Sequence, residues 1–203
     1  MEQFMKLRAF INLEKIEWDW LSQNTAPNAI KLLEANQEKI NWASLSQNPG
    51  AIKLLEANQE KIHWTSLSRN TTPEAIKLLE ANQEKINWWN LSGNPSPNAI
   101  KLLDANQKKI YWDWMSRNPS AMKLLEANQE KINWGMLSEN TAPEAMKLLE
   151  DNPEKIDWDC LSQNSAPEAI KLLEANQEKI NWEMLSTNIS PDAINLLEAN
   201  PEK

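Results

Sequence analysis

Apolar residues recur along this chain at helical spacing, inside a phrase that is repeated many times. In its most regular form the phrase is PEAIKLLEANQEKI, at residues 73–86. The apolar residues of this phrase, through to Ile86, fall on one face of a helix with 3.6 residues per turn, and its Lys and Glu side chains can face water. We predict a helix that begins at Pro73, because proline suits the first helical position. We expect Asn82 to end it, because Asn tolerates the left-handed conformation of a helix terminator.

A shorter phrase, Trp-x-x-Leu/Met-Ser-x-Asn, alternates with these helices. Its tryptophan and its leucine or methionine are three residues apart and share a helical face. At Trp88 the phrase is preceded by Asn87, a good N-cap, so we predict a short helix from Trp88 to Ser92, either α or 3₁₀. The phrase occurs eight times, at intervals of 22 or 24 residues, with its tryptophan at Trp18, Trp42, Trp64, Trp88, Trp112, Trp134, Trp158 and Trp182.

Neither helix can bury its apolar face alone, so the repeats must stack on one another. We therefore predict an all-α fold, an α-solenoid of about eight repeats of 22–24 residues, each a longer α-helix plus a short helix. In this prediction residues 1–203 form a single array, with a capping helix at 1–17 and tandem repeats at 18–203. The eight repeated tryptophans are predicted to form the structural core.

A larger period is superimposed on the repeats. The two 22-residue intervals fall where the loop before the longer helix is shortened, at NPGA (48–51) and NPSA (118–121). These two sites are 70 residues apart. The pattern predicts a duplicated block of three repeats, at 18–87 and 88–157.

Three polar series also recur in every repeat. We interpret the asparagines from Asn24 to Asn188, and those from Asn36 to Asn200, as caps of helix ends. The alternative for them is a ladder of buried asparagines. The serines from Ser22 to Ser186 are predicted to bond to the backbone at helix ends.

Composition narrows the classes of function. The chain carries 21 Lys and Arg against 29 Asp and Glu, a net charge of −8, which disfavours binding to nucleic acid. Its one cysteine, Cys160, and its one histidine, His63, lack partners at catalytic or metal-ligand spacing. We expect no enzymatic activity, cofactor, metal or membrane contact. The absence of a signal sequence favours an intracellular, reducing compartment.

Positions that vary between repeats indicate an exposed surface. They are the two residues after each repeated tryptophan and the residue after each serine, and one face of the short helices would carry them. Aromatic residues, Met and Arg, the usual anchors of protein interfaces, occur on or near that face. The candidate partner-binding residues are Trp20, Trp89, Tyr111, Trp114, Met136, Met184, Arg69 and Arg117. The alternative is that these side chains only fill local gaps.

Two functions are compatible with this organisation. The first is a non-enzymatic scaffold that binds a protein through the variable face of its short helices. The alternative is a structural protein that associates end to end into filaments or particles, because the last helix, from Pro191, would leave Ile194 and Leu197 uncovered. The partner is accordingly a protein of unknown identity or a second copy of the chain.

The repeats at 18–203 resemble a known type. NPSAMKLLEAN at 118–128 and KINW at 131–134 match the pattern NPxAIxLLExNxxKIxW, which fills uncharacterised proteins of giant, mimivirus-like DNA viruses. The resemblance implies a viral repeat protein and brings no established activity with it. In layout the chain is also similar to the leucine-rich-repeat variant, whose repeats pair an α-helix with a short 3₁₀ helix.

Overall fold

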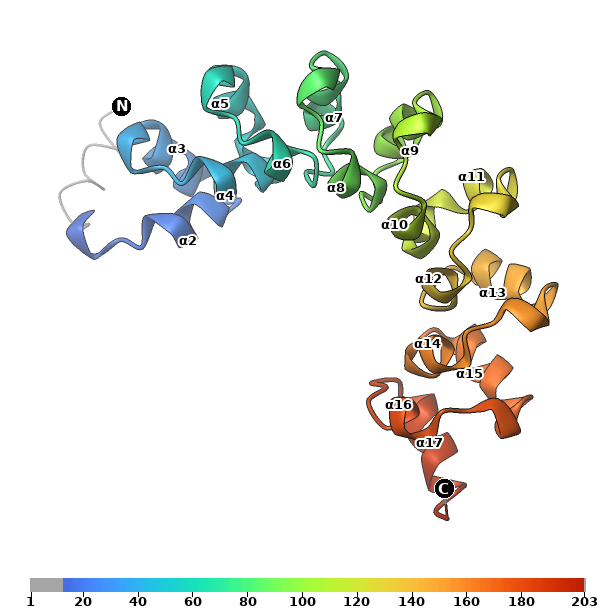
Figure 1. The fold of residues 1–203 in the computed structure, drawn as a ribbon. Coiled ribbons are helices and arrows are strands. Elements are labelled where there is room, and N and C mark those ends of the chain that lie inside the picture. Colours follow the sequence, from blue (N-terminus) through green and yellow to red (C-terminus); the bar gives the residue numbers. More distant parts are fainter. Residues whose placement is uncertain (1–12, 203) are drawn as a thin grey trace. The chain divides into compact units, whose positions relative to one another are not determined.

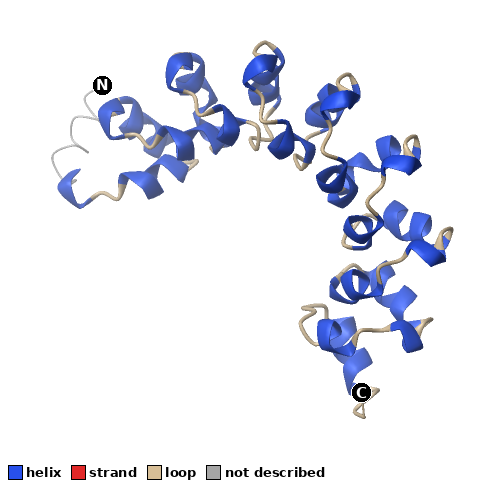
Figure 2. Ribbon diagram, in the orientation of Figure 1, coloured by secondary structure: helices blue, strands red, loops and turns tan. Residues whose placement is uncertain are grey.

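The computed structural model describes residues 13–202. Within this range the protein is all-α and has no strand (Figure 2). Each repeat pairs a short helix with a longer helical segment, which in two repeats is a 3₁₀ turn followed by a five-residue α-helix. The predicted α-solenoid class is thereby confirmed. Most of the predicted capping helix, residues 1–12, lies outside the described residues, and Leu13–Lys15 form a 3₁₀ turn.

The chain divides into two compact units, Met1–Asn87 and Trp88–Lys203, which we call the N-terminal and C-terminal units. The division coincides with the boundary between the two predicted blocks, 18–87 and 88–157. The N-terminal unit holds the first three repeats, and the first block is therefore contained within it. The prediction of a single continuous array stays a prediction.

In the N-terminal unit the short helices pack side by side, α2 against α4 and α4 against α6. The longer helices lie in a second row, where α3 packs against the turn that precedes α5, and α5 packs against α7 (Figure 1). The helices are α2 (Trp18–Gln23), α3 (Pro27–Glu34), α4 (Trp42–Gln47), α5 (Ile52–Glu56), α6 (Trp64–Leu67) and α7 (Pro73–Glu80).

The C-terminal unit is built in the same way, with short helices α8, α10, α12, α14 and α16 in contact in chain order. Its longer helices form the other row, in which α13 packs against α15 and α15 against α17 (Figure 1). The helices are α8 (Trp88–Ser92), α9 (Pro97–Asp104), α10 (Trp112–Arg117), α11 (Met122–Glu126), α12 (Trp134–Ser138), α13 (Pro143–Glu150), α14 (Trp158–Gln163), α15 (Pro167–Glu174), α16 (Trp182–Leu185) and α17 (Pro191–Glu198).

Most repeats contain a third element that the sequence analysis did not separate from the longer helix. It is a 3₁₀ turn of three residues, found at Gln37–Lys39, Gln59–Lys61, Gln83–Lys85, Gln107–Lys109, Gln129–Lys131, Pro153–Lys155 and Gln177–Lys179. Two further 3₁₀ turns, Pro49–Ala51 and Pro119–Ala121, precede α5 and α11 in the shortened loops. As a result α7 begins at Pro73, as predicted, but ends at Glu80. Ile86 is buried, but it follows the 3₁₀ turn in an extended conformation and is not part of the helix.

The longer helices do not end in the way predicted from Asn82. Its backbone has φ −134° and ψ 52°, and no described residue, glycine included, has a positive φ. Instead, Asn82 Nδ2 donates a hydrogen bond to the carbonyl of Leu78 at 2.9 Å. The side chain thus satisfies a carbonyl at the helix end, so no left-handed residue is needed. The prediction of a left-handed terminator is wrong, while the interpretation of this series as caps is supported.

The deepest core positions are leucines, not the repeated tryptophans. Leu45, Leu67, Leu91, Met115 and Leu137, each three residues after a repeated tryptophan, have no exposed surface. All eight tryptophans are half-buried, so the prediction that they form the core is corrected. A lysine of the following repeat lies over the indole in three cases, with Nζ to ring-centroid distances of 4.9 Å for Lys61–Trp42, 4.7 Å for Lys85–Trp64 and 4.3 Å for Lys155–Trp134.

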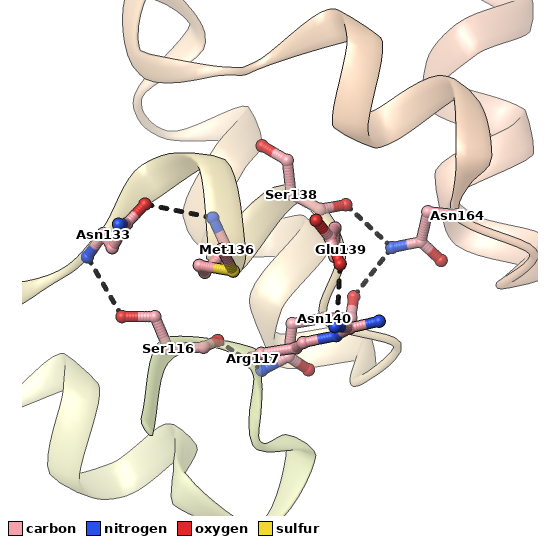
Figure 3. A network of polar contacts seen from close by, with 8 residues as sticks. All are labelled: Ser116, Arg117, Asn133, Met136, Ser138, Glu139, Asn140 and Asn164. Carbon is pink, nitrogen blue, oxygen red and sulfur yellow. Dashed lines mark hydrogen bonds and ion pairs between the residues drawn. The ribbon is translucent and has the colours of Figure 1, made fainter. Parts of the chain in front are cut away.

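Serine and asparagine side chains join successive repeats. Ser116 Oγ donates to the carbonyl of Trp112 at 2.7 Å and accepts from the backbone N–H of Asn133 at 3.0 Å. The buried Asn164 donates from Nδ2 to the carbonyls of Ser138 and Asn140, both at 2.9 Å (Figure 3).

Asn164 also caps its own loop, because its Oδ1 accepts from the N–H of Ala166 at 3.0 Å. The series is therefore both a cap and a buried ladder. In the described part of the chain no buried side-chain nitrogen or oxygen lacks a hydrogen-bond partner, as a stable interior requires.

Candidate binding site on the short helices

The variable positions of the short helices meet in two rows across the junctions between repeats. In the first row, the residue after one repeated tryptophan lies beside the residue before the next. Three junctions place an Asp and an Asn there, and the Asn Nδ2 donates to the Asp Oδ1. The pairs are Asn41–Asp19 at 2.9 Å, Asn133–Asp113 at 2.9 Å and Asn181–Asp159 at 2.7 Å.

These asparagines have a second role, because each is the N-cap of its short helix. Asn41 Oδ1 accepts from the N–H of Ser44 at 3.0 Å, and Asn133 Oδ1 accepts from the N–H of Met136 at 3.1 Å (Figure 3). One side chain therefore links two repeats and satisfies a free amide at a helix start. At these junctions the first row belongs to the framework of the fold.

The junction between α8 and α10 departs from this pattern. Trp89 stands in the Asp position and Tyr111 in the Asn position, and the Tyr111 side chain makes no cap hydrogen bond. Losing an Asn cap costs about 0.5–2 kcal/mol. This junction therefore presents two exposed aromatic rings where three other junctions hold a stabilising polar pair.

The second row pairs the residue after each serine with the residue two positions after the next tryptophan. Gln163 Nε2 lies 3.0 Å from Met184 Sδ in this arrangement. At the junction of α8 and α10 the pair is Gly93 and Trp114. A Cβ built on Gly93 would lie 3.5 Å from Trp114 Cε3, which is ordinary contact. Because glycine has no side chain, nothing from this position covers the Trp114 ring.

Several of these residues line a hollow of about 450 Å³ on α8, α10 and α12, which we call the aromatic pocket. The ring centroids of Trp89 and Trp114 are 4.8 Å apart with the planes at 73°, an edge-to-face arrangement. Trp89 is 41% exposed, Tyr111 52% and Trp114 36%. The pocket is lined by Trp89, Ile110, Tyr111, Trp112, Asp113, Trp114, Arg117 and Met136.

The charges at the pocket are partly compensated. Arg117 Nε and Glu139 Oε2 are 3.1 Å apart, in an ion pair between partly exposed side chains (Figure 3). Asp113 holds no ion pair in that network and instead accepts from Asn133. Counting Arg117, Glu139 and Asp113 together, the pocket and its edge carry one net negative charge.

Glu139 also faces the next repeat, where it acts on Cys160. Partial burial raises the pKa of the Cys160 thiol to about 11, and the negative charges of Asp157 and Glu139 contribute to the rise. The thiol is therefore protonated at neutral pH and a poor nucleophile. His63, which directly precedes α6, is exposed, and its Nδ1 lies 2.9 Å from Ser66 Oγ.

The structure brings five of the eight candidate partner-binding residues together in the aromatic pocket: Trp89, Tyr111, Trp114, Met136 and Arg117. The other three lie elsewhere. Trp20, 72% exposed, and Arg69 belong to the N-terminal unit, and Met184 contacts Gln163 on α14. Sequence reasoning missed Ile110, Trp112 and Asp113 because it treated the first two as core and counted Asp113 only as a variable residue.

The N-terminal unit has a hollow at the matching place on α4, of about 420 Å³. Its lining is small or polar instead of aromatic: Gln23, Ala43, Ser44, Gln47, Asn48, Pro49 and Ser66. Ser44, Gln47 and Ser66 stand 70 residues before Trp114, Arg117 and Met136. The two blocks thus share a surface position and differ in its chemistry.

The two candidate self-association residues lie on α17. Ile194 is 44% exposed, whereas Ile170 at the same position of the preceding repeat is 1% exposed. Leu197 is half-buried, whereas the matching Leu173 has no exposed surface. End-to-end association stays a prediction.

Within residues 13–202, no group of three His, Cys, Asp or Glu side chains is placed to hold a metal ion. In the same range no helix has both the length and the apolar character needed to cross a membrane. Comparison of the chain with protein-family models, with curated proteins and with solved structures gives no match.

Proposed function

We propose that this chain is a non-enzymatic repeat scaffold that binds a protein partner through the short-helix surface of its C-terminal unit. The observation that supports this most is the junction of α8 and α10, where exposed aromatic rings replace the Asp–Asn pair and the N-cap that three other junctions hold. Sequences that give up local stabilisation at one site among many equivalent ones usually do so for function.

The lining of the aromatic pocket has the composition of an interface anchor. Trp, Tyr and Arg dominate the residues on which binding energy depends, and Met adapts to varied partners. Trp89, Tyr111 and Trp114 are all partly exposed, so a partner could remove their apolar surface from water.

A binding role also fits the polar groups around the pocket better than catalysis does. Asp113 is bonded to Asn133, and Arg117 is paired with Glu139. Cys160 is held as a neutral thiol. An active site needs an acid, base or nucleophile that is free to act on a substrate, and these groups are occupied by one another.

The proposal can be tested with a matched variant that the chain itself supplies. The N-terminal block has Asp19, Asn41 and Ser44 at the places of Trp89, Tyr111 and Trp114. The triple variant Trp89→Asp, Tyr111→Asn, Trp114→Ser therefore gives the second block, at these three positions, the residues that the first block already carries. Loss of the ring pair costs about 0.5–1.5 kcal/mol, and the restored N-cap offsets a similar amount, so the variant should fold normally.

The measurement is selection from a phage-displayed library of random 12-residue peptides, followed by binding of the selected peptides by fluorescence polarisation. Wild-type protein should yield a related set of peptides, and the triple variant should lose their binding. A control variant, Trp20→Ser, removes the most exposed tryptophan of the chain outside the pocket and should retain it. Peptides that bind the triple variant as tightly as wild type would overturn the proposal.

Self-association is the alternative function, and sedimentation of the same samples distinguishes it. A mass that rises with concentration, and that falls with Ile194→Lys, would favour association through α17. A wild-type chain that stays monomeric while binding selected peptides supports the scaffold function.

A further inference from the structure

We infer that the aromatic pocket receives a quaternary ammonium group, the trimethylated side chain of a lysine on the protein partner. This inference rests on the proposed function and adds the chemistry of the group that the pocket takes. It begins from the arrangement of rings, because Trp89, Tyr111 and Trp114 line one hollow and the ring planes of Trp89 and Trp114 are 73° apart. Aromatic rings that face a hollow from several directions stabilise a quaternary cation through their π faces.

The fold already places ammonium groups on indole rings. Lys61, Lys85 and Lys155 each lie 4.3–4.9 Å from the ring centroid of a tryptophan in the preceding repeat. Those indoles belong to the repeated series and are covered from within the chain. Trp89 and Trp114 are additional to the series and are partly exposed, so their faces can take a cation from outside.

Charge also favours a cation over an anion. Arg117 is 3.1 Å from Glu139, which compensates its charge, and the carboxylate of Asp113 lines the pocket. The whole chain carries a net charge of −8, which attracts a basic segment of a partner and repels an acidic one. Methylated lysines belong to such basic segments, so the occupant has the charge that this surface complements.

The pocket suits a methylated ammonium better than a plain one. A lysine ammonium carries three N–H donors and is strongly hydrated. The lining of the aromatic pocket offers such donors one carboxylate, that of Asp113, and its Oδ1 already accepts a hydrogen bond from Asn133. A trimethylammonium group has the same charge and no N–H donors, so it loses little when aromatic and aliphatic side chains replace water.

The pocket is a surface hollow of about 450 Å³, which leaves room for the aliphatic stem of the side chain beside its head group. It lies on the row of short helices proposed to contact the partner. A side chain carried by a protein that rests on this row can enter from outside, and we therefore assign the group to a protein and not to a free small molecule.

The test uses full-length protein and three fluorescein-labelled 11-residue peptides of glycine, serine and arginine that differ only at the central residue. That residue is trimethyllysine, lysine, or the uncharged isostere in which carbon replaces the quaternary nitrogen. Cation–π attraction at a partly exposed site predicts that the trimethyllysine peptide binds about tenfold more tightly than its uncharged isostere. The weaker hydration of trimethyllysine predicts a preference of similar size over unmodified lysine. Fluorescence polarisation at fixed ionic strength gives the three dissociation constants.

Three variants locate the effect. Trp114→Ser should abolish the preference for trimethyllysine, whereas Trp20→Ser should leave it unchanged. Asp113→Asn keeps every aromatic ring, and it should weaken binding of the trimethyllysine peptide several-fold without changing binding of the uncharged isostere. A purely hydrophobic pocket would not distinguish those two peptides.

Four results would overturn the inference. They are equal binding of the trimethyllysine peptide and its uncharged isostere, tighter binding of unmodified lysine, binding of none of the three peptides, and choline alone binding as tightly as the peptide, which would assign the pocket to a small molecule. If any of these occurs while the selected library peptides still require Trp89, Tyr111 and Trp114, the proposed scaffold function stands and only its ligand chemistry is wrong.

Discussion

The short helices α4 and α10 occupy the same position in two blocks of one sequence, 70 residues apart, yet they carry different surfaces. Beneath both surfaces the framework is the same. Ser46 and Ser116 each bond to the carbonyl of a tryptophan four residues earlier, and each accepts from the backbone of the next repeat. On the surface, the position that Ser44 occupies in the first block is occupied by Trp114 in the second. The comparison shows that the serine bonds between repeats are kept while surface residues differ.

The difference is also one of local stability. Asn41 caps α4 and bonds to Asp19, whereas Tyr111 does neither at α10. The buried leucines do not differ in this way, since Leu67 and Leu137 both have no exposed surface. A change in the framework should therefore have the same effect in both blocks, and a change in the surface should not.

The largest expected effect comes from the shared core. Leu137→Ala should lower the free energy of unfolding by about 4 kcal/mol, because it leaves a cavity at a fully buried position. Leu67→Ala, its counterpart in the first block, should lower the stability of the N-terminal unit by a similar amount. Urea melts of both variants measure this, and a much smaller loss in either block would break the equivalence of the two frameworks.

The repeated tryptophans should matter less than these leucines. Trp134→Ala should cost about 2 kcal/mol, since a half-buried indole removes only part of its apolar area from water. Trp64→Ala provides the comparison in the first block, because Lys85 covers Trp64 as Lys155 covers Trp134. If Trp134→Ala proved more damaging than Leu137→Ala, the tryptophans would be the core after all.

A smaller change in the free energy of unfolding, of opposite sign, is expected at the junction of α8 and α10, where the surfaces of the two blocks differ. Tyr111→Asn should raise the free energy of unfolding by about 1 kcal/mol, because it restores an N-cap at the start of α10. The reverse change in the first block, Asn41→Tyr, should lower it by a similar amount. Thermal melts that show no gain at Tyr111 would mean that this junction gives up no stability for its aromatic rings.

The smallest effect concerns Glu139, which stands where the first block has Arg69. Because the pKa of Cys160 is raised to about 11, its alkylation by iodoacetamide should keep accelerating from pH 8 to pH 10, where an ordinary thiol levels off. Glu139→Gln removes a negative charge, so it should lower this pKa and speed alkylation at pH 8. A rate that levels off below pH 9 in the wild type would contradict the assignment.

Much of the fold could be predicted because a repeated pattern averages out local ambiguity. Pro73 marked a helix start correctly, and the recurrence of one phrase indicated stacked helices. The 3₁₀ turn of Gln83–Lys85 was missed because its residues favour helices of any kind and continue the pattern of α7. The tryptophans were misplaced because a large apolar residue at an invariant position resembles core, whereas the pattern cannot show that a lysine from the next repeat covers its ring.

The candidate site was predicted in part. Variation between repeats identified Trp89 and Trp114 as exposed, and spacing alone could not show that their rings touch. Gly93 carried an unused signal, since no other repeat has glycine after its serine. Asp113 was overlooked because the hydrogen bond that binds Asp to the following Asn becomes visible only when two repeats are seen side by side.

The central claim is that surface residues alone distinguish the two blocks, and a transplant tests it most directly. In a chain whose second block carries the triple variant, the first block would receive the aromatic set by Asp19→Trp, Gln23→Gly, Asn41→Tyr, Ala43→Asp, Ser44→Trp and Ser66→Met. Ile40 and Trp42 already match Ile110 and Trp112, and Gln47 is kept because Arg69 stands where Glu139 would pair with an arginine. Fluorescence polarisation with a library-selected peptide should show binding restored in a protein of nearly unchanged stability, whereas a folded protein without binding would contradict the account.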